Sequence, residues 1–183
     1  MKPIFTVHAG EYLVASYVEK RFKKYKVWLP SIDKGVDLLL TSSKSGKQVG
    51  LQVKFSKDFL AAHMSPMFHK GLLSCGWWTL SRDKIKKSKA DFWIFVLYSF
   101  DQPDDPQYLI ITPQRLLTIL KAIHGNARLI NTYFWVTKKH NCWEARGLNK
   151  SDQRQIASHT YSNTKRDMTK FLNDWDSIKK VLK

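Results

Sequence analysis

Residues 91–100 (DFWIFVLYSF) form the most apolar run in the chain. The length of this run and its aromatic and β-branched side chains favour a buried central β-strand over a helix. Two further apolar segments, 36–41 (VDLLLT) and 48–55 (QVGLQVKF), lie on either side of the polar turn SSKSGK. Gly46 in that turn is typical of a β-hairpin, so the two segments are expected to pair with each other.

The rest of the chain alternates between helical and extended patterns. Helices are expected at 10–25, within 57–70, at 113–123 with Thr112 as N-cap, and at 169–182. Further strands are expected at 25–29, 76–80, 108–111, 132–137 and 142–145. A basic connector is expected at 82–89, a loop at 101–106 and an irregular segment at 149–164. This order predicts a single α/β domain over residues 1–183, built around one mixed central sheet, with additional strands and a helix at 107–183.

The charge of the chain indicates the kind of partner it binds. Lys and Arg number 31 and Asp and Glu 15, which gives a net charge of +16 in 183 residues. Such an excess favours a polyanionic partner, most often a nucleic acid. The alternative is that the lysine-rich surface serves only solubility.

Several other classes of protein are not expected. No window approaches the roughly 18 apolar residues that a membrane-spanning helix requires, and the N-terminus lacks the apolar stretch of a secretory signal. Cys75 and Cys142 are too few for a disulfide framework. We therefore expect a cytoplasmic protein without a membrane partner.

One carboxylate is expected inside the first helix. On a helical wheel, five apolar side chains fall within about 60° of Glu11: Val14, Ala15, Val18, Phe22 and Tyr25. A helix that buries this stripe carries Glu11 inward. A buried carboxylate needs a cation, a metal or hydrogen-bond donors, or it becomes protonated.

The expected hairpin collects three polar side chains on one face. Because side chains alternate along a strand, Asp37 points away from Leu38, and Gln52 and Lys54 point away from Val53. A hairpin symmetric about Lys44–Ser45 places Asp37 opposite Gln52, although a bulge in the turn would shift that register. If the first helix packs nearby, Glu11 joins this group. Oxygen ligands of this kind suit Mg²⁺, and a lysine beside them can orient water or stabilise phosphate charge.

These residues resemble the PD-(D/E)XK nuclease superfamily, in particular its restriction-endonuclease-like and Holliday-junction-resolvase-like members. The resemblance lies in Glu11, in the run DKGVDLL at 33–39 and in LQVK at 51–54, and it spans roughly residues 8–57. It implies an αβββαβ core over about 8–100. It also implies that Asp37 and Glu11 bind metal and that Lys54 is catalytic. Gln52 stands where the family usually has Glu or Asp, although some branches carry Gln there.

The expected function is therefore metal-dependent hydrolysis of DNA phosphodiester bonds. Glu11, Asp37 and Gln52 would hold Mg²⁺, which Mn²⁺ can replace, and Lys54 would assist the attacking water. One alternative is a nuclease-like module that binds nucleic acid without cutting it, and another is a ribonuclease of the same fold. Each residue also has a purely structural interpretation: a salt bridge between Glu11 and Lys54, backbone donors on Asp37, or a solvated sheet face.

Other residues are weaker candidates for contacts with nucleic acid. Basic side chains that could grip a phosphate backbone are Lys57, Arg82, Lys84, Lys86 and Lys87, although a charged run is usually a solvated face. Trp77 and Trp78 could stack on bases, and at least one of them is expected in the core. A homodimer is expected for duplex cutting, with its interface near 133–135 or on the last helix.

Overall fold

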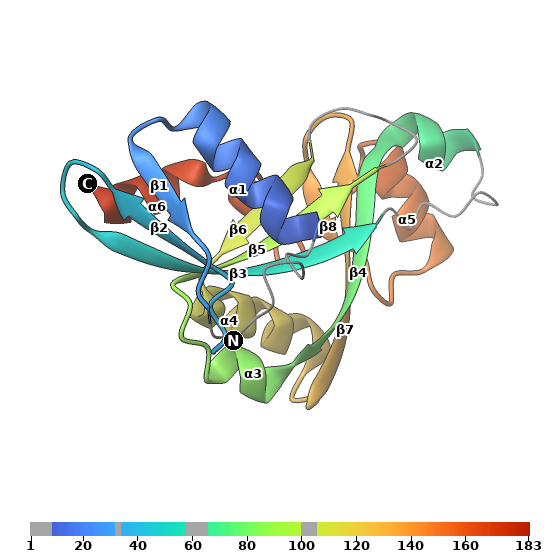
Figure 1. Ribbon diagram of the computed structural model, residues 1–183. Helices are drawn as coiled ribbons and strands as arrows, with labels where there is room; N and C mark the ends of the chain where they lie inside the picture. The colour runs from blue at the N-terminus through green and yellow to red at the C-terminus, as the bar shows by residue number, and fades with distance from the viewer. Residues whose placement is uncertain (1–8, 32–33, 58–65, 100–105) are drawn as a thin grey trace.

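The computed structural model describes residues 9–31, 34–57, 66–99 and 106–183 (Figure 1). Its helices are α1 (Ala9–Arg21), α2 (Pro66–Gly71), α3 (Arg82–Lys86), α4 (Pro113–His124), α5 (Lys150–Ala157) and α6 (Trp175–Leu182), with a 3-10 turn at Thr169–Phe171. Its strands are β1 (Tyr25–Trp28), β2 (Leu38–Ser42), β3 (Gln48–Lys57), β4 (Leu72–Ser81), β5 (Phe92–Tyr98), β6 (Gln107–Ile111), β7 (Leu129–Thr137) and β8 (Cys142–Glu144). The protein is therefore an α/β chain, as predicted. The loop expected at 101–106 lies almost wholly outside the described residues, as do residues 58–65 of the segment at 57–70.

The main sheet has five strands in the order β1-β2-β3-β5-β6. β3 and β5 run parallel, and the other neighbours are antiparallel, so the sheet is mixed. β5 corresponds to the most apolar run, and six of its seven residues are buried because it lies between β3 and β6. In the β2–β3 hairpin Leu38 is paired with Leu51, which is the register that the symmetric turn predicts.

A second sheet, β4-β7-β8, is antiparallel throughout. The mixed central sheet is as predicted, whereas a separate second sheet was not predicted. β4 follows β3 in the chain, but it pairs with β7 along almost its whole length. The side of β3 that β4 would have taken is occupied by β5.

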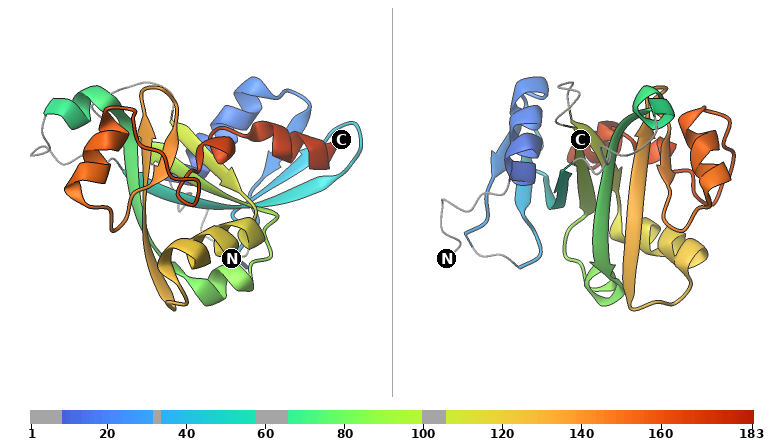
Figure 2. Two further views of the ribbon diagram at one scale, coloured as in Figure 1. Left: turned by 180° about the vertical axis from the view of Figure 1, so that it is seen from behind. Right: turned by 90° about the vertical axis from the view of Figure 1, so that its right-hand side faces the viewer.

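The two sheets and the helices form layers (Figure 2). α1 and α6 cover one face of the main sheet, where Val14 and Trp175 pack in one cluster with Val49, Leu51 and Ile94. The other face packs against the second sheet together with α3 and α4.

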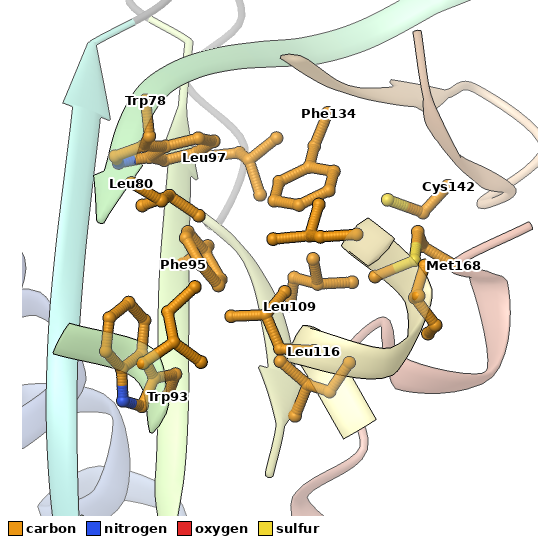
Figure 3. Packing of buried hydrophobic residues seen from close by; sticks show 14 of the residues in the cluster. Trp78, Leu80, Trp93, Phe95, Leu97, Leu109, Leu116, Phe134, Cys142 and Met168 are labelled. Atoms are coloured by element: carbon orange, nitrogen blue, oxygen red, sulfur yellow. The ribbon is translucent and has the colours of Figure 1, made fainter. Parts of the chain in front are cut away.

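The core between the two sheets is aromatic at its centre (Figure 3). The ring centroids of Trp78 and Phe95 lie 5.1 Å apart, and those of Phe95 and Phe134 lie 5.2 Å apart, both in edge-on geometry. Such pairs stabilise a core beyond the area that they bury. Met168 and Cys142 close the same cluster on the side away from Trp78 and Phe95.

Three segments differ from their sequence-based predictions. The basic connector 82–89 contains α3, which Ser81 caps by accepting a hydrogen bond from Lys84 N and which buries Ile85. The irregular segment 149–164 contains α5, capped by Asn149, with Ile156 and Ala157 buried. In both, few apolar side chains reach the core, so the helical period is faint.

The expected helix at 169–182 is interrupted. A 3-10 turn ends at Phe171, Asn173 has φ +54°, and α6 starts only at Trp175. Asp174 caps α6 by accepting from Ser177 N. The left-handed Asn173 breaks a hydrophobic spacing that otherwise looks continuous. Within the part of the chain that the structure describes, no helix is long and apolar enough to span a membrane.

Candidate functional site

Asp37 lies immediately before β2, which begins at Leu38. Gly35 turns the chain at φ +86°, a conformation that favours glycine. Asp37 N then donates to Leu51 O at 2.7 Å, and Asp37 Oδ2 accepts from Val53 N at 2.7 Å. The carboxylate thus serves Val53 N of β3 as the acceptor that a backbone carbonyl of a neighbouring strand would otherwise provide. Only 7% of its surface remains exposed.

Gln52 is the second residue of the site. Its Nε2 donates to the same Asp37 Oδ2 at 2.7 Å. Gln52 Oε1 points toward Gly35, where an added Cβ would lie 3.9 Å from it. The predicted placement of Asp37 opposite Gln52 is therefore confirmed. The alternative, in which backbone donors satisfy Asp37 for purely structural reasons, is also supported, because Val53 N donates to its carboxylate.

Lys54 follows two residues later on the same face of β3. Its Nζ lies 5.4 Å from the ring centroid of Trp93 on β5. Trp93 is itself held by a hydrogen bond from Nε1 to Ser88 Oγ at 2.9 Å. Attraction between the cation and the ring keeps the ammonium group at the edge of the buried core.

A pocket of about 620 Å³ opens beside Gln52 and Lys54. The other residues that line it are Lys34, Gly35, Ser81, Asp83, Lys84, Lys87, Ser88, Lys89 and Arg128. Six of the lining side chains are cationic and one is acidic. We call this feature the lysine pocket. Its charge suits a ligand with several negative charges, such as a phosphodiester backbone.

The residues predicted to contact nucleic acid divide into groups. Lys84 and Lys87 line the lysine pocket, whereas Lys86 does not. Arg82 turns toward the end of α4, where its guanidinium donates to Ala127 O at 2.8 Å and to Gly125 O at 2.5 Å. Lys57 ends β3, and its side chain lies outside the described part of the structure.

Glu11 approaches β3 from the other side of the sheet. It is buried, with 3% of its surface exposed, as the helical wheel predicted. The start of α1 lies close to β3, because a Cβ on Gly10 would lie 2.6 Å from the Cβ of Phe55. α1 packs on the face that carries Val53, so Glu11 reaches β3 from the side opposite to Gln52 and Lys54.

The side chains around Asp37 offer few ligands for the Mg²⁺ that the sequence implies. Among the described residues there is no group of three or more His, Cys, Asp or Glu side chains that could hold a metal ion. Mg²⁺ is nevertheless often bound by one or two carboxylates, with waters and substrate phosphates as the remaining ligands. A carboxylate and an amide oxygen are donors of the kind that Mg²⁺ takes, so the chemistry of Asp37 and Gln52 suits such an ion. In this structure Asp37 Oδ2 accepts hydrogen bonds from Val53 N and Gln52 Nε2 instead.

Sequence reasoning missed part of the lysine pocket. Lys89 belongs to the basic run and Lys34 adjoins Gly35, so both had a local signal. Arg128 had none, because it is far from the motif in the chain. It reaches the pocket because Arg82 N bonds Arg128 O at 2.9 Å, which joins the start of α3 to the start of β7.

The fold and the site together define an α/β protein in which a carboxylate, an amide and a lysine lie beside a cationic pocket. No protein family, curated protein or solved structure was found to match this chain.

Proposed function

We propose that the protein is a metal-dependent endonuclease that hydrolyses phosphodiester bonds in nucleic acid, with DNA preferred over RNA. The observation that carries the proposal is the juxtaposition of Asp37, Gln52 and Lys54 with the lysine pocket. The resemblance to the PD-(D/E)XK superfamily supports it. So does the order of α1, β1, β2 and β3 followed by β5 parallel to β3, although α2, β4 and α3 intervene.

In this proposal each residue has a separate task. Asp37 and the amide oxygen of Gln52 would hold Mg²⁺ or Mn²⁺ next to the scissile phosphate, whereas Glu11 lies on the opposite, α1 side of the sheet and is not part of this ligand pair. When bound, such an ion would supply polarisation of the phosphate and activation of the attacking water. Lys54 stabilises the negative charge that develops on the phosphate oxygens. Lys34, Lys84 and Lys87 neutralise the backbone on either side and position it.

A second candidate is a module of the same kind that binds nucleic acid without cutting it. The hydrogen bond from Gln52 Nε2 to Asp37 Oδ2 favours this candidate, because it satisfies the carboxylate with no metal present. Gln in place of an acidic residue also removes one negative ligand and so weakens metal binding.

The test is cleavage of plasmid DNA and of a structured RNA with Mg²⁺, Mn²⁺ or EDTA. The informative variants are Lys54→Ala and Asp37→Asn, the second of which keeps an acceptor for Val53 N while removing the charge. Lys26→Ala is the matched control, since Lys26 is an exposed lysine on β1 of the same sheet.

The nuclease proposal expects metal-dependent cutting that falls at least about 100-fold in both site variants and is unchanged in the control. If the wild type shifts DNA on a gel but cuts neither substrate, the binding module becomes the better assignment. Cutting of RNA alone would assign a ribonuclease.

Two further elements complete the proposal. A cytoplasmic location accords with Cys75 and Cys142, which are buried and form no disulfide among the described residues. Cutting both strands of a duplex would require two active sites, which a homodimer would provide. Phe134 and Trp135 are buried within the chain, so of the segment suggested as an interface only Tyr133 reaches the surface.

A further inference from the structure

One face of the second sheet carries exposed aromatic side chains. Trp78 and Leu80 point into the core, so Trp77 and Thr79 point outward from β4. Trp77 is 42% exposed, and its ring centroid lies 6.4 Å from that of Tyr133, its partner on β7. The guanidinium carbon of Arg146 lies 5.2 Å above the Trp77 ring. The second sheet thus presents two aromatic rings and a cation on one surface.

This surface leads directly to the lysine pocket. The outward pairs along the two strands are Trp77 with Tyr133, then Thr79 with Asn131, then Ser81 with Leu129. Thr79 Oγ1 donates to Asn131 Oδ1 at 2.8 Å in the middle pair. Ser81 lines the lysine pocket, and so does Arg128, next to Leu129 in the chain.

The distance along this surface suits a short stretch of nucleic acid. Four residues of strand separate Ser81 from Trp77, which is about 13 Å at 3.3 Å per residue. A chain whose phosphates lie in the pocket can therefore extend its next bases over the rings. We call the surface formed by Trp77, Thr79, Asn131, Tyr133 and Arg146 the aromatic face.

We propose that the aromatic face stacks unpaired bases of the nucleic acid whose backbone lies in the lysine pocket. The substrate class is then single-stranded or partly single-stranded nucleic acid. This inference rests on the proposed function for the role of the pocket. Aromatic rings and arginine planes bind unstacked bases without strong sequence preference, whereas paired bases in a duplex are already stacked.

The charge of the aromatic face and the lysine pocket favours nucleic acid over a second copy of the chain as the binding partner. Arg146 lies on the aromatic face, and the adjoining lysine pocket has six cationic side chains and one acidic one. A second copy would bring the same positive charge, since the whole chain carries +16. A polyanion with exposed bases complements both the cations and the rings.

The test is binding measured by fluorescence anisotropy in EDTA, so that no metal-dependent cleavage can occur. The probes are an oligothymidylate and a blunt duplex of equal length. The variants are Trp77→Ala and, to retain a ring, Trp77→Phe. Trp28→Ala is the matched control, because Trp28 is 53% exposed but lies on β1, at the far edge of the main sheet.

We expect Trp77→Ala to weaken oligothymidylate binding about 5- to 150-fold, which corresponds to the roughly 1–3 kcal/mol of one lost base stack. Trp77→Phe should stay within about threefold of the wild type, and Trp28→Ala should equal it. Binding of the duplex should change little in all three variants.

Unchanged oligothymidylate binding by Trp77→Ala, or an equal loss for the duplex, would overturn the inference. A wild-type dimer in sedimentation that Trp77→Ala converts to a monomer would also overturn it, because the face would then join two copies. Absence of cleavage with Mg²⁺ is a separate result: it refutes the nuclease, whereas the binding data alone decide the aromatic face.

Discussion

Replacement of Gln52 by Glu tests whether Asp37 is arranged for a cation. In the wild type, Gln52 Nε2 donates to Asp37 Oδ2 across 2.7 Å. Gln52→Glu removes this bond to a charged group, which is worth about 1.5–3 kcal/mol. It also places two carboxylates together, and charges 4 Å apart repel by about 4 kcal/mol at an effective dielectric constant of 20. Side-chain relaxation and solvent reduce this repulsion.

We therefore expect the variant in EDTA to lose about 2–4 kcal/mol of its free energy of unfolding. For a chain of this size that loss lowers Tm by roughly 4–16 °C. Mg²⁺ should reverse the effect, because a ligand at 100 times its Kd adds about 2.7 kcal/mol to the stability of the folded state. The assay is thermal unfolding in EDTA and across a Mg²⁺ titration.

The matched control is Gln48→Glu, which adds the same charge to an exposed position of β3. Its stability should stay within about 0.5 kcal/mol of the wild type. The reasoning is refuted if Gln52→Glu is as stable as this control in EDTA, or if Mg²⁺ stabilises both variants equally.

Three further predictions concern other parts of the molecule. Glu144 is fully buried, and its Oε2 lies 2.6 Å from Arg166 Nη1, so Arg166→Met should cost about 3–5 kcal/mol in urea unfolding; a loss under about 1 kcal/mol would contradict this. Burial raises the pKa of the Cys142 thiol far above its ordinary value, so up to about pH 9 a thiol reagent should modify Cys142 only after unfolding, as peptide mapping can show. Lys84→Ala should reduce the slope of log affinity for DNA against log salt by about 0.9, whereas Lys86→Ala, outside the lysine pocket, should leave the slope unchanged.

Local patterns in the sequence were enough to predict the hairpin and the heart of the site. Alternation along 36–41 and 48–55, with a short turn between them, determined both the register and the common face of Asp37, Gln52 and Lys54. A one-residue slip would have turned Leu51 and Val53 toward solvent, so burial of those side chains enforces the same register. The inward position of Glu11 followed from helical periodicity in the same way.

Short helices were less predictable because few of their residues reach the core. In α3 the basic side chains surround Ile85, and in α5 burial is confined to Ile156 and Ala157. Capping by Ser81 and Asn149 starts these helices, but Ser and Asn are equally common in turns. The prediction of one continuous helix at 169–182 was wrong for a related reason. The left-handed Asn173 interrupts the helix, but the spacing of apolar residues in the sequence does not reveal this interruption.

The sequence by itself determined the strand alternation, the buried central strand, the basic charge and the residues of the motif, because each depends on neighbours within a few positions. The tertiary structure alone decided that β4 leaves the main sheet and pairs with β7, that Arg128 joins the lysine pocket and that Trp77 rather than Trp78 faces outward. Alternation requires only that the two tryptophans point to opposite faces. Which face is covered depends on packing between segments far apart in the chain, and a local pattern carries no record of those partners.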